Sequence, residues 1–201
     1  MSDIDFASLG LADGILAALR EEGYSVPTPV QARSIPPLLA GKDLLGIART
    51  GTGKTAAFAL PIIQHIVNHP IEKRAQGSVR AIIVAPTREL AAQIDESFAA
   101  YGRGYKLLRA CVFGGVGKAP QIQALWRGVD VLVATPGRLL DLLSDNKLRL
   151  DRVEFAVLDE ADRMLDMGFI RDVRRIVALL PKDRQTALFS ATIPPRIASI
   201  A

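Results

Sequence analysis

The sequence is poor in cysteine, histidine and aromatic residues, and these shortages exclude several classes of protein. Cys111 is the only cysteine among 201 residues, so no internal disulfide can form. A reducing compartment is expected, and the thiol is interpreted as a small buried hydrophobe. His65 and His69 lack the histidine or carboxylate partners of a metal site, so they are interpreted as solvated or helix-end residues.

The chain also lacks an apolar run of membrane-spanning length, and its acidic first ten residues do not resemble a secretory signal. The cytoplasm is therefore the expected location. Hydrophobic residues make up 49% and charged residues 23% of the sequence, which fits one globular domain with a substantial core. A net charge of +4 permits an anionic partner without requiring nucleic acid.

Residues 48–55 read ARTGTGKT and carry the strongest functional signal in the chain. Gly51 and Gly53 let successive backbone N–H groups converge on one anion. Lys54 supplies a positive charge for the outer phosphates, and the Thr55 hydroxyl can ligate magnesium at the start of a helix. The pattern predicts a phosphate-binding loop for a nucleoside triphosphate.

The residues around this loop support that interpretation. Residues 44–47 are expected to form a short buried strand, and the apolar spacing after the loop predicts a helix that is kinked at Pro61. Ala48 stands where the strict pattern has glycine, which is the smallest possible departure. The alternative is an ordinary glycine-rich turn that caps a helix, and the order strand, loop, helix disfavours it.

Two helices are predicted before the loop. The first covers 11–22 and ends at Gly23. The second runs from Pro29 to about residue 39, with Thr28 as its N-cap and an interruption at Pro36–Pro37.

Five further apolar runs have the pattern of strands that are buried on both faces, and each is followed by a polar motif. The alternation of these runs with helices predicts an α/β fold with a mostly parallel sheet that is covered by helices on both faces. The polar motifs then lie together at the carboxyl edge of the sheet, where open α/β sheets bind ligands. The runs cover 81–85, 107–113, 131–134, 155–158 and 187–189.

Three acidic residues follow the run 155–158. Asp159 is expected to hold magnesium opposite Thr55, because a carboxylate at the end of a buried strand can reach across to the metal. Glu160 can orient an attacking water for phosphoryl transfer. Asp162 is not explained by nucleotide chemistry alone. Acidic residues are also favoured at a helix N-terminus, but the phosphate loop upstream weakens that alternative.

The chain carries a series of short motifs in a recognisable order, from PTPVQ at 27–31 to SAT at 190–192. In that order they resemble the N-terminal RecA-like domain of DEAD-box ATP-dependent RNA helicases, and the resemblance covers nearly the whole chain. The first residues resemble bacterial RhlE-type members. The resemblance implies a RecA-like P-loop fold, ATP and Mg²⁺ as ligands, sequence-independent contacts with the RNA backbone, and unwinding of short RNA duplexes coupled to ATP hydrolysis. The motifs are Gly23-Tyr24 with PTPVQ (27–31), ARTGTGKT, PTREL, GG, TPGR, DEAD and SAT.

The resemblance assigns the nucleotide site residue by residue. It implies that Gln31 recognises adenine and that Tyr24 stacks on the base. Phe6 corresponds either to an upstream aromatic of the family or to a core anchor for the first helix. The implied catalytic residues are Lys54, Asp159 and Glu160. The implied nucleotide-binding set is Tyr24, Gln31, Thr50, Gly51, Thr52, Gly53, Lys54 and Thr55, with magnesium on Thr55 and Asp159.

A second set is implied to bind RNA, and a third to couple ATP to unwinding. Thr87 and Thr135 have an additional interpretation as N-caps, with Pro136 at a first helical position, and both interpretations can hold together. The coupling hydroxyls could equally cap the last helix before Pro194. The implied RNA-binding residues are Pro86, Thr87, Arg88, Gly114, Gly115, Thr135, Pro136, Gly137 and Arg138, of which Arg88 and Arg138 add charge. The implied coupling residues are Asp162, Ser190 and Thr192.

Three other features receive structural interpretations. Trp126 shares a helical stripe with Ile122 and Leu125, so it is predicted to lie in the core. Residues 101–105 are predicted to be a helix end and a turn. A solvated helix face is predicted for Arg171, Arg174 and Arg175.

The expected organisation is a single RecA-like ATP-binding domain over 1–201, with a Q-motif helical region at 1–40 and a P-loop core at 41–201. Nothing in the sequence resembles the second RecA-like domain of the family, which carries the arginine that completes the ATP site. The chain by itself is therefore expected to be nearly inactive. One alternative is a non-catalytic nucleotide- or RNA-binding module. Another is a RecA-like motor that acts on DNA or protein, which Gln31 and the DEAD tetrad disfavour.

Overall fold

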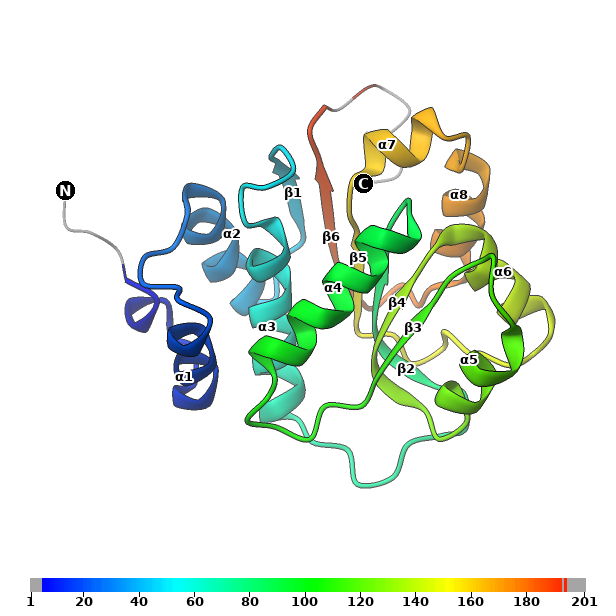
Figure 1. Cartoon of the computed structure of the whole chain (residues 1–201), viewed down its shortest axis with the longest axis horizontal. Helices are drawn as coiled ribbons and strands as arrows, with labels where there is room; N and C mark the ends of the chain where they lie inside the picture. The colour runs from blue at the N-terminus through cyan, green and yellow to red at the C-terminus, as the bar shows by residue number, and fades with distance from the viewer. Residues whose placement is uncertain (1–4, 193, 195–201) are drawn as a thin grey trace.

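The computed structural model describes residues 5–192 and residue 194. At its centre lies a six-stranded sheet in the order β1-β6-β5-β2-β4-β3, and every neighbouring pair of strands is parallel (Figure 1). The predicted α/β fold with a parallel sheet is therefore confirmed. The strands are β1 (Leu44–Ile47), β2 (Val79–Val84), β3 (Arg109–Val112), β4 (Val129–Ala134), β5 (Phe155–Leu158) and β6 (Gln185–Ser190).

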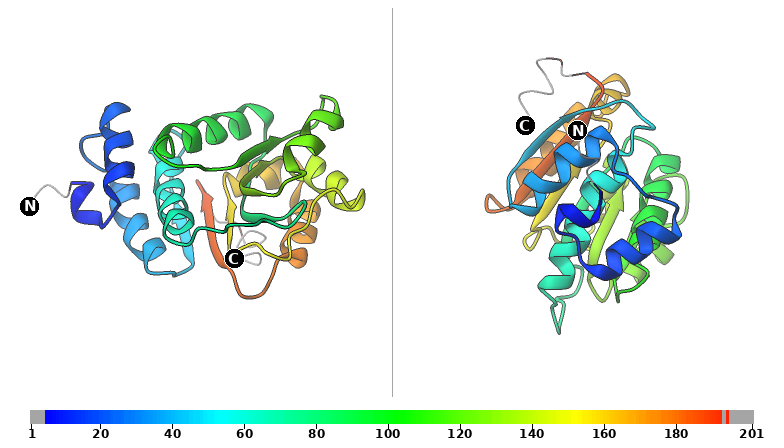
Figure 2. Two further views of the ribbon diagram at one scale, coloured as in Figure 1. Left: turned by 90° about the horizontal axis from the view of Figure 1, so that it is seen from below. Right: turned by 90° about the vertical axis from the view of Figure 1, so that its left-hand side faces the viewer.

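Helices cover both faces of this sheet, because successive strand residues point to opposite sides. Ala81 and Ile83 belong to one buried cluster, whereas Ile82 and Val84 belong to the other. The first four helices pack on the first cluster and the last four on the second (Figure 2). They are α1 (Asp13–Glu21), α2 (Pro29–Leu39), α3 (Lys54–Asn68) and α4 (Arg88–Tyr101), then α5 (Lys118–Leu125), α6 (Pro136–Ser144), α7 (Ala161–Asp166) and α8 (Ile170–Leu179).

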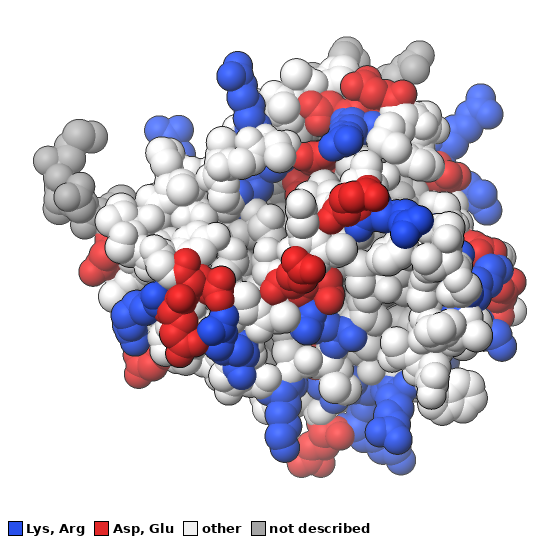
Figure 3. Space-filling model, viewed as in Figure 1, with Lys and Arg blue, Asp and Glu red and all other residues white. Residues whose placement is uncertain are grey.

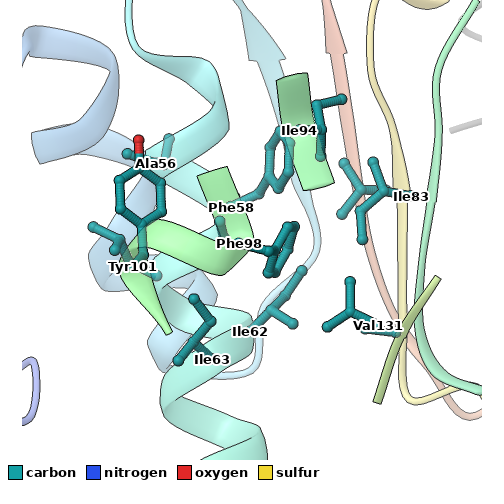
Figure 4. Packing of buried hydrophobic residues seen from close by; sticks show 14 of the residues in the cluster. Ala56, Phe58, Ile62, Ile63, Ile83, Ile94, Phe98, Tyr101 and Val131 are labelled. Atoms are coloured by element: carbon teal, nitrogen blue, oxygen red, sulfur yellow. The ribbon is translucent and has the colours of Figure 1, made fainter. Parts of the chain in front are cut away.

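Aromatic rings join helices α3 and α4 to the sheet in the first cluster. The ring centroid of Phe58 lies 6.3 Å from that of Phe98 and 5.6 Å from that of Phe189. Figure 4 shows Phe58 and Phe98 among the aliphatic side chains of this cluster. A Cβ atom at Gly46 would stand 2.6 Å from the Phe189 ring, so glycine in β1 makes room for this ring. The helix that begins with the phosphate loop is thus fixed to the sheet.

Two predictions about the first ninety residues need correction. Helix α2 is not interrupted at Pro36–Pro37 but continues to Leu39. Each proline removes only one helical hydrogen bond, while the buried Ile35 anchors this part of the helix. The strand at 44–47 exists, but it is an edge strand, and Ile47 is 69% exposed. Within the described residues, no strand pairs with its outer side.

Two other side chains also lie in unexpected places. Trp126 is 59% exposed and does not belong to the core, whereas Leu125 beside it is fully buried. Helix α5 ends at Leu125, and Trp126 follows it as the C-cap residue. His65 lies in the last turn of α3, as its helix-end interpretation predicts, but its Nε2 is 2.7 Å from the Glu154 carboxylate, a partner that was not expected. Phe6 is 4% exposed, which favours its role as a core anchor.

A chain of ion pairs links the strands near their starting points. Arg80 donates to the Glu154 carboxylate through Nε at 2.6 Å, and Arg74 contacts the buried Asp130 at 2.7 Å. Partial burial alone would raise the pKa of Glu154, but hydrogen bonds from His65 and Arg80 outweigh it and lower the pKa from 4.5 to about 2. The ionised carboxylate therefore stabilises the folded state.

We expect Glu154→Gln to lower the free energy of unfolding at neutral pH, because Arg80 then lacks its nearest charged partner. The folded-state pKa lies below the unfolded value of 4.5, so the stabilisation is present above that pH and is lost as pH falls toward 2. Since the side chain is 35% exposed, screening limits the effect to about 1–2 kcal/mol. Urea unfolding over this pH range measures the difference.

The control for this prediction is Asp151→Asn. Asp151 pairs with Arg149 at 2.8 Å, but both side chains are about half exposed. Its loss should therefore change stability by less than about 0.5 kcal/mol. An equal loss of stability in the two variants would contradict the role of the Glu154 network.

Candidate functional site

The phosphate loop connects β1 to α3 and has the backbone that a phosphate cradle requires. Gly51 has a φ of 83° and Gly53 a φ of 88°, which side chains rarely permit. At Gly53 a Cβ atom would also stand 2.4 Å from the Gln31 side-chain nitrogen. Position 53 therefore requires glycine both for its dihedral angle and for this close approach.

Helix α2 holds the loop from outside. The Gln31 amide donates from Nε2 to the Gly53 carbonyl at 3.1 Å, and the Thr28 hydroxyl donates to the Thr52 carbonyl at 2.8 Å. The same two side chains close a capping box at the start of α2. Sequence reasoning missed this support, although the spacing of Thr28 and Gln31 was a signal for the capping box. Gln31 is fully buried, and one amide N–H and one oxygen lone pair are left for another partner.

A buried ion pair lies at the centre of the site. The Lys54 Nζ is 3.4 Å from the Asp159 Oδ1, and the two side chains are 6% and 2% exposed. Burial, the largest cause, raises the pKa of Asp159, although the Lys54 ammonium acts in the opposite direction. A carboxylate in such surroundings fits a bound cation, because the cation would compensate for the lost hydration. Thr55, in the first turn of α3, is half-buried.

Glu160 is held in place by a strained backbone and by its neighbours. It is the N-cap of α7 with a φ of 52°, a conformation that non-glycine residues rarely adopt. Its carboxylate accepts a short hydrogen bond from the Thr50 hydroxyl and lies 3.3 Å from the Arg163 guanidinium. The contact with Thr50 connects the acidic motif directly to the phosphate loop. Strain of this kind is typical of functional sites.

The three predicted coupling residues meet at one point. The Asp162 backbone N–H donates to the Ser190 hydroxyl at 3.1 Å, and the Thr192 N–H and hydroxyl donate to the Asp162 carboxylate at 3.0 and 3.1 Å. Partial burial would raise the pKa of Asp162, but these hydrogen bonds lower it overall. The alternative, in which the hydroxyls cap a last helix before Pro194, falls largely outside the described residues.

The predicted RNA-binding motifs also converge. The Arg88 guanidinium lies 5.1 Å from the centre of the Phe113 ring, and a Cβ atom at Gly115 would be 2.7 Å from Arg88. Arg138 donates to the Val116 carbonyl at 2.9 Å, so it supports the same loop. Its side chain is only 9% exposed, whereas Arg88 is exposed. Of the two arginines, Arg88 is therefore the one available to a ligand.

The helix-cap interpretation of this region is only half right. The Thr87 hydroxyl accepts from the Leu90 N–H at 3.2 Å, as an N-cap does. Thr135 occupies the N-cap position of α6 without a side-chain cap bond, and Pro136 follows in the first turn. Of the remaining predicted residues, Pro86 is buried, Gly114 is half-buried and Gly137 is exposed.

Tyr24 lies in an aromatic cluster with Phe6 and Tyr101. Its ring meets Phe6 edge to face at 6.3 Å and Tyr101 at 5.9 Å, and its hydroxyl is 3.0 Å from that of Tyr101. The ring thus packs between the start of the chain and the end of α4. Stacking of Tyr24 on a base stays a prediction.

A family model described as "DEAD/DEAH box helicase" matches residues 28–200. The chain belongs to this family. It is 44% identical over 196 residues to "ATP-dependent RNA helicase dbp2" of Schizosaccharomyces pombe and 42% identical over 196 residues to "DEAD-box ATP-dependent RNA helicase 20" of Arabidopsis thaliana. Each match covers 98% of this chain, but only 36% and 39% of the two relatives. The chain thus spans little more than a third of their length.

A solved structure supports the same assignment. The crystal structure of a DEAD box protein from the hyperthermophile Methanococcus jannaschii is 40% identical, with a TM-score of 0.90, over 98% of this chain and 52% of that chain. The predicted resemblance to DEAD-box helicases is confirmed. The two helicases above are eukaryotic, so they do not support the RhlE-type subgroup, which stays a prediction. In the described part of this family member, no helix is long and apolar enough to cross a membrane.

Proposed function

We propose that this chain is the N-terminal, RecA-like ATP-binding domain of an ATP-dependent RNA helicase, with a Q-motif region at 1–40 and a P-loop core at 41–201. The buried contact between Lys54 and Asp159 carries this proposal. It joins the phosphate loop to the acidic motif in the place where a nucleoside triphosphate needs both a cation and a metal ligand. A location in the cytoplasm stays a prediction.

The roles within the site follow from the chemistry of each side chain. Lys54 binds the outer phosphates, together with the backbone N–H groups of the glycine loop. Thr55 and Asp159 are the residues that would hold Mg²⁺, which supplies charge neutralisation when it is bound. Glu160 orients the attacking water, because its carboxylate is fixed by Thr50 beside the loop. A non-catalytic module would not need this second, strained carboxylate.

RNA is the proposed partner at the convergence of the PTREL, GG and TPGR motifs. The exposed Arg88 guanidinium and the backbone at Gly115 offer charge and N–H groups without reading bases, so binding should not depend on sequence. Arg138 acts by supporting the loop. The proposal also includes a second RecA-like domain as a partner, since closure of two domains on one strand is needed to unwind a duplex.

We expect Gln31→Ala to weaken ATP binding and to narrow the preference for ATP over GTP. A side-chain amide can pair with both N6 and N7 of adenine, and the loss of such a pair reduces discrimination by about 1–3 kcal/mol. Titrations with fluorescent ATP and GTP analogues measure the ratio of the two affinities. If wild type binds both nucleotides equally, adenine recognition by Gln31 is wrong.

The matched control for Gln31 is Thr28→Ala. This change removes the capping oxygen and the bond to the Thr52 carbonyl but leaves the amide in place. It should weaken ATP and GTP binding by the same factor, because only the support of the loop is lost. A change in the ATP to GTP ratio in Thr28→Ala would show that loop geometry, and not the amide, selects the base.

A further inference from the structure

The exposed side chain of Trp126 lies at the edge where the strands begin, opposite the phosphate loop. A groove of about 770 Å³ runs along it, and Leu108 and Gly128, which precede β3 and β4, help to line this groove. A second hollow of about 280 Å³ is lined by Gln76, Asn146 and the same tryptophan. Trp126 thus presents its ring to two hollows. Tryptophan is enriched where proteins contact their partners, because its ring combines a large apolar face with an N–H donor.

The charges around these hollows have a single sign. The charged residues that line them are Arg109, Arg127, Lys147 and Arg149, and no carboxylate is among them. Two of these cations are already paired, Arg109 with Asp95 at 2.6 Å and Arg149 with Asp151 at 2.8 Å. For Arg127 and Lys147, which are both exposed, no ion pair is found in the part of the chain that the structure describes. Figure 3 shows several Lys and Arg side chains along the lower edge of the molecule, with Asp or Glu side chains between some of them. Arg127 and Lys147 therefore favour an anionic occupant.

An unpaired nucleic acid strand fits this combination better than an acidic peptide. Each nucleotide offers a phosphate for a cation and a flat base for an aromatic ring, and such stacking does not depend on sequence. Side-chain amides from Gln76, Gln123 and Asn146 lie along the hollows and can bond to base edges. A duplex would not serve, because its bases are already stacked. An acidic peptide would use the cations but would leave the ring and the amides without a function.

We infer that the groove at Trp126 is a second contact for single-stranded RNA, in addition to the face formed by Arg88 and Gly115. Helix α5 connects the two places, since it begins shortly after Gly115 and ends beside Trp126. Its eight residues span about 12 Å, so one RNA strand reaches both. The inference rests on the proposed RNA helicase function and adds a second RNA site to it.

The single tryptophan provides a direct test, because the indole fluorescence of this 201-residue chain comes from Trp126 alone. The probe is an oligouridylate of about ten nucleotides, within the roughly 4–16 nucleotides that one single-strand-binding fold covers. Stacking should quench the fluorescence in a saturable way. Trp126→Ala should weaken binding of the labelled RNA by roughly 5- to 100-fold, and Trp126→Phe should restore most of the affinity. The ring is exposed, so both variants should fold, which circular dichroism checks.

The cations are tested through the salt dependence of binding. Arg127→Ala with Lys147→Ala should lower the slope of log affinity against log salt by about 1.4, or about 0.7 for each lost phosphate contact. Arg171→Ala with Arg175→Ala is the matched control, because it removes the same charge from an exposed face of α8. If both double variants lose affinity equally, only the overall charge matters and the inference is wrong.

The two RNA sites are separated by Arg88→Glu. This change should weaken overall RNA binding, while the remaining binding still quenches Trp126. RNA that binds without any quenching would overturn the groove but leave the face at Arg88 intact. If a polyglutamate peptide of equal charge quenches Trp126 as strongly as RNA does, the groove belongs to an acidic protein partner and the RNA inference is wrong. If no RNA binds while the preference for ATP persists, the groove inference fails and the nucleotide site stands.

Discussion

Lys54→Ala is expected to abolish ATP binding or nearly so, whereas Glu160→Gln should leave binding largely intact. The lysine ammonium is buried beside Asp159, and in the proposed site it neutralises phosphate. In the proposed site Glu160 only orients water, and a glutamine there can still accept the hydrogen bond from Thr50. Nucleotide binding is measured by titration of each variant with a fluorescent ATP analogue in the presence of Mg²⁺.

The control for this pair is Lys42→Ala, which removes the same charge from an exposed position before β1. It should bind nucleotide like wild type. Within a two-domain protein, Glu160→Gln should slow hydrolysis by about 10²-fold, as expected when an attacking group loses its correct position. Equal loss of binding in Lys54→Ala and Glu160→Gln would show that the two side chains do not have separate roles.

The 201-residue chain alone should hydrolyse ATP about 10³- to 10⁵-fold more slowly than the same residues within a protein that also has a second RecA-like domain. An arginine finger contributes a factor of this size where one completes a phosphoryl-transfer site. The chain should also bind RNA weakly and should not unwind duplexes. Steady-state ATPase assays with saturating RNA compare the two proteins.

Two arginines of the chain itself provide the alternative to this result. Arg163 lies 3.3 Å from the Glu160 carboxylate, and Arg49 is exposed in the phosphate loop. Hydrolysis by the chain alone at the rate of the two-domain protein would mean that one of them completes the site. In that case Arg163→Ala or Arg49→Ala would abolish the activity. Loss of activity in neither variant would exclude both.

The fold could be predicted because its signals are local. Strands such as 155–158 are apolar on both faces, so their burial in a parallel sheet follows from composition alone. Two predictions of burial were wrong, one for a strand at the edge of the sheet and one for a residue at the end of a helix. Ile47 and Trp126 are as apolar as core residues, but one lies on an edge strand and the other past the end of a helix. Which strand becomes the edge depends on the order of the sheet, and that order is set by contacts distant in sequence.

The candidate site could likewise be predicted only in part. Lys54, Asp159 and Glu160 could be named from their motifs, and the structure brings the first two into contact. The contacts that support these residues could not be predicted from the motifs. Gln31 donates to the Gly53 carbonyl, and Arg138 supports a loop although its charge alone suggested an RNA contact. Both contacts depend on side-chain orientations that motifs do not encode.

The position of β6 has a consequence for how the protein folds during synthesis. Among the described strands, β1, which leads into the phosphate loop, pairs only with β6, so Leu44 cannot pair until Ala187 has been synthesised. The Ala48 N–H likewise bonds to the Ser190 carbonyl at 3.0 Å. Contacts this distant in sequence form slowly, and they form last on a growing chain. The ribosome must therefore release nearly all of these residues before the loop that binds phosphate acquires its shape.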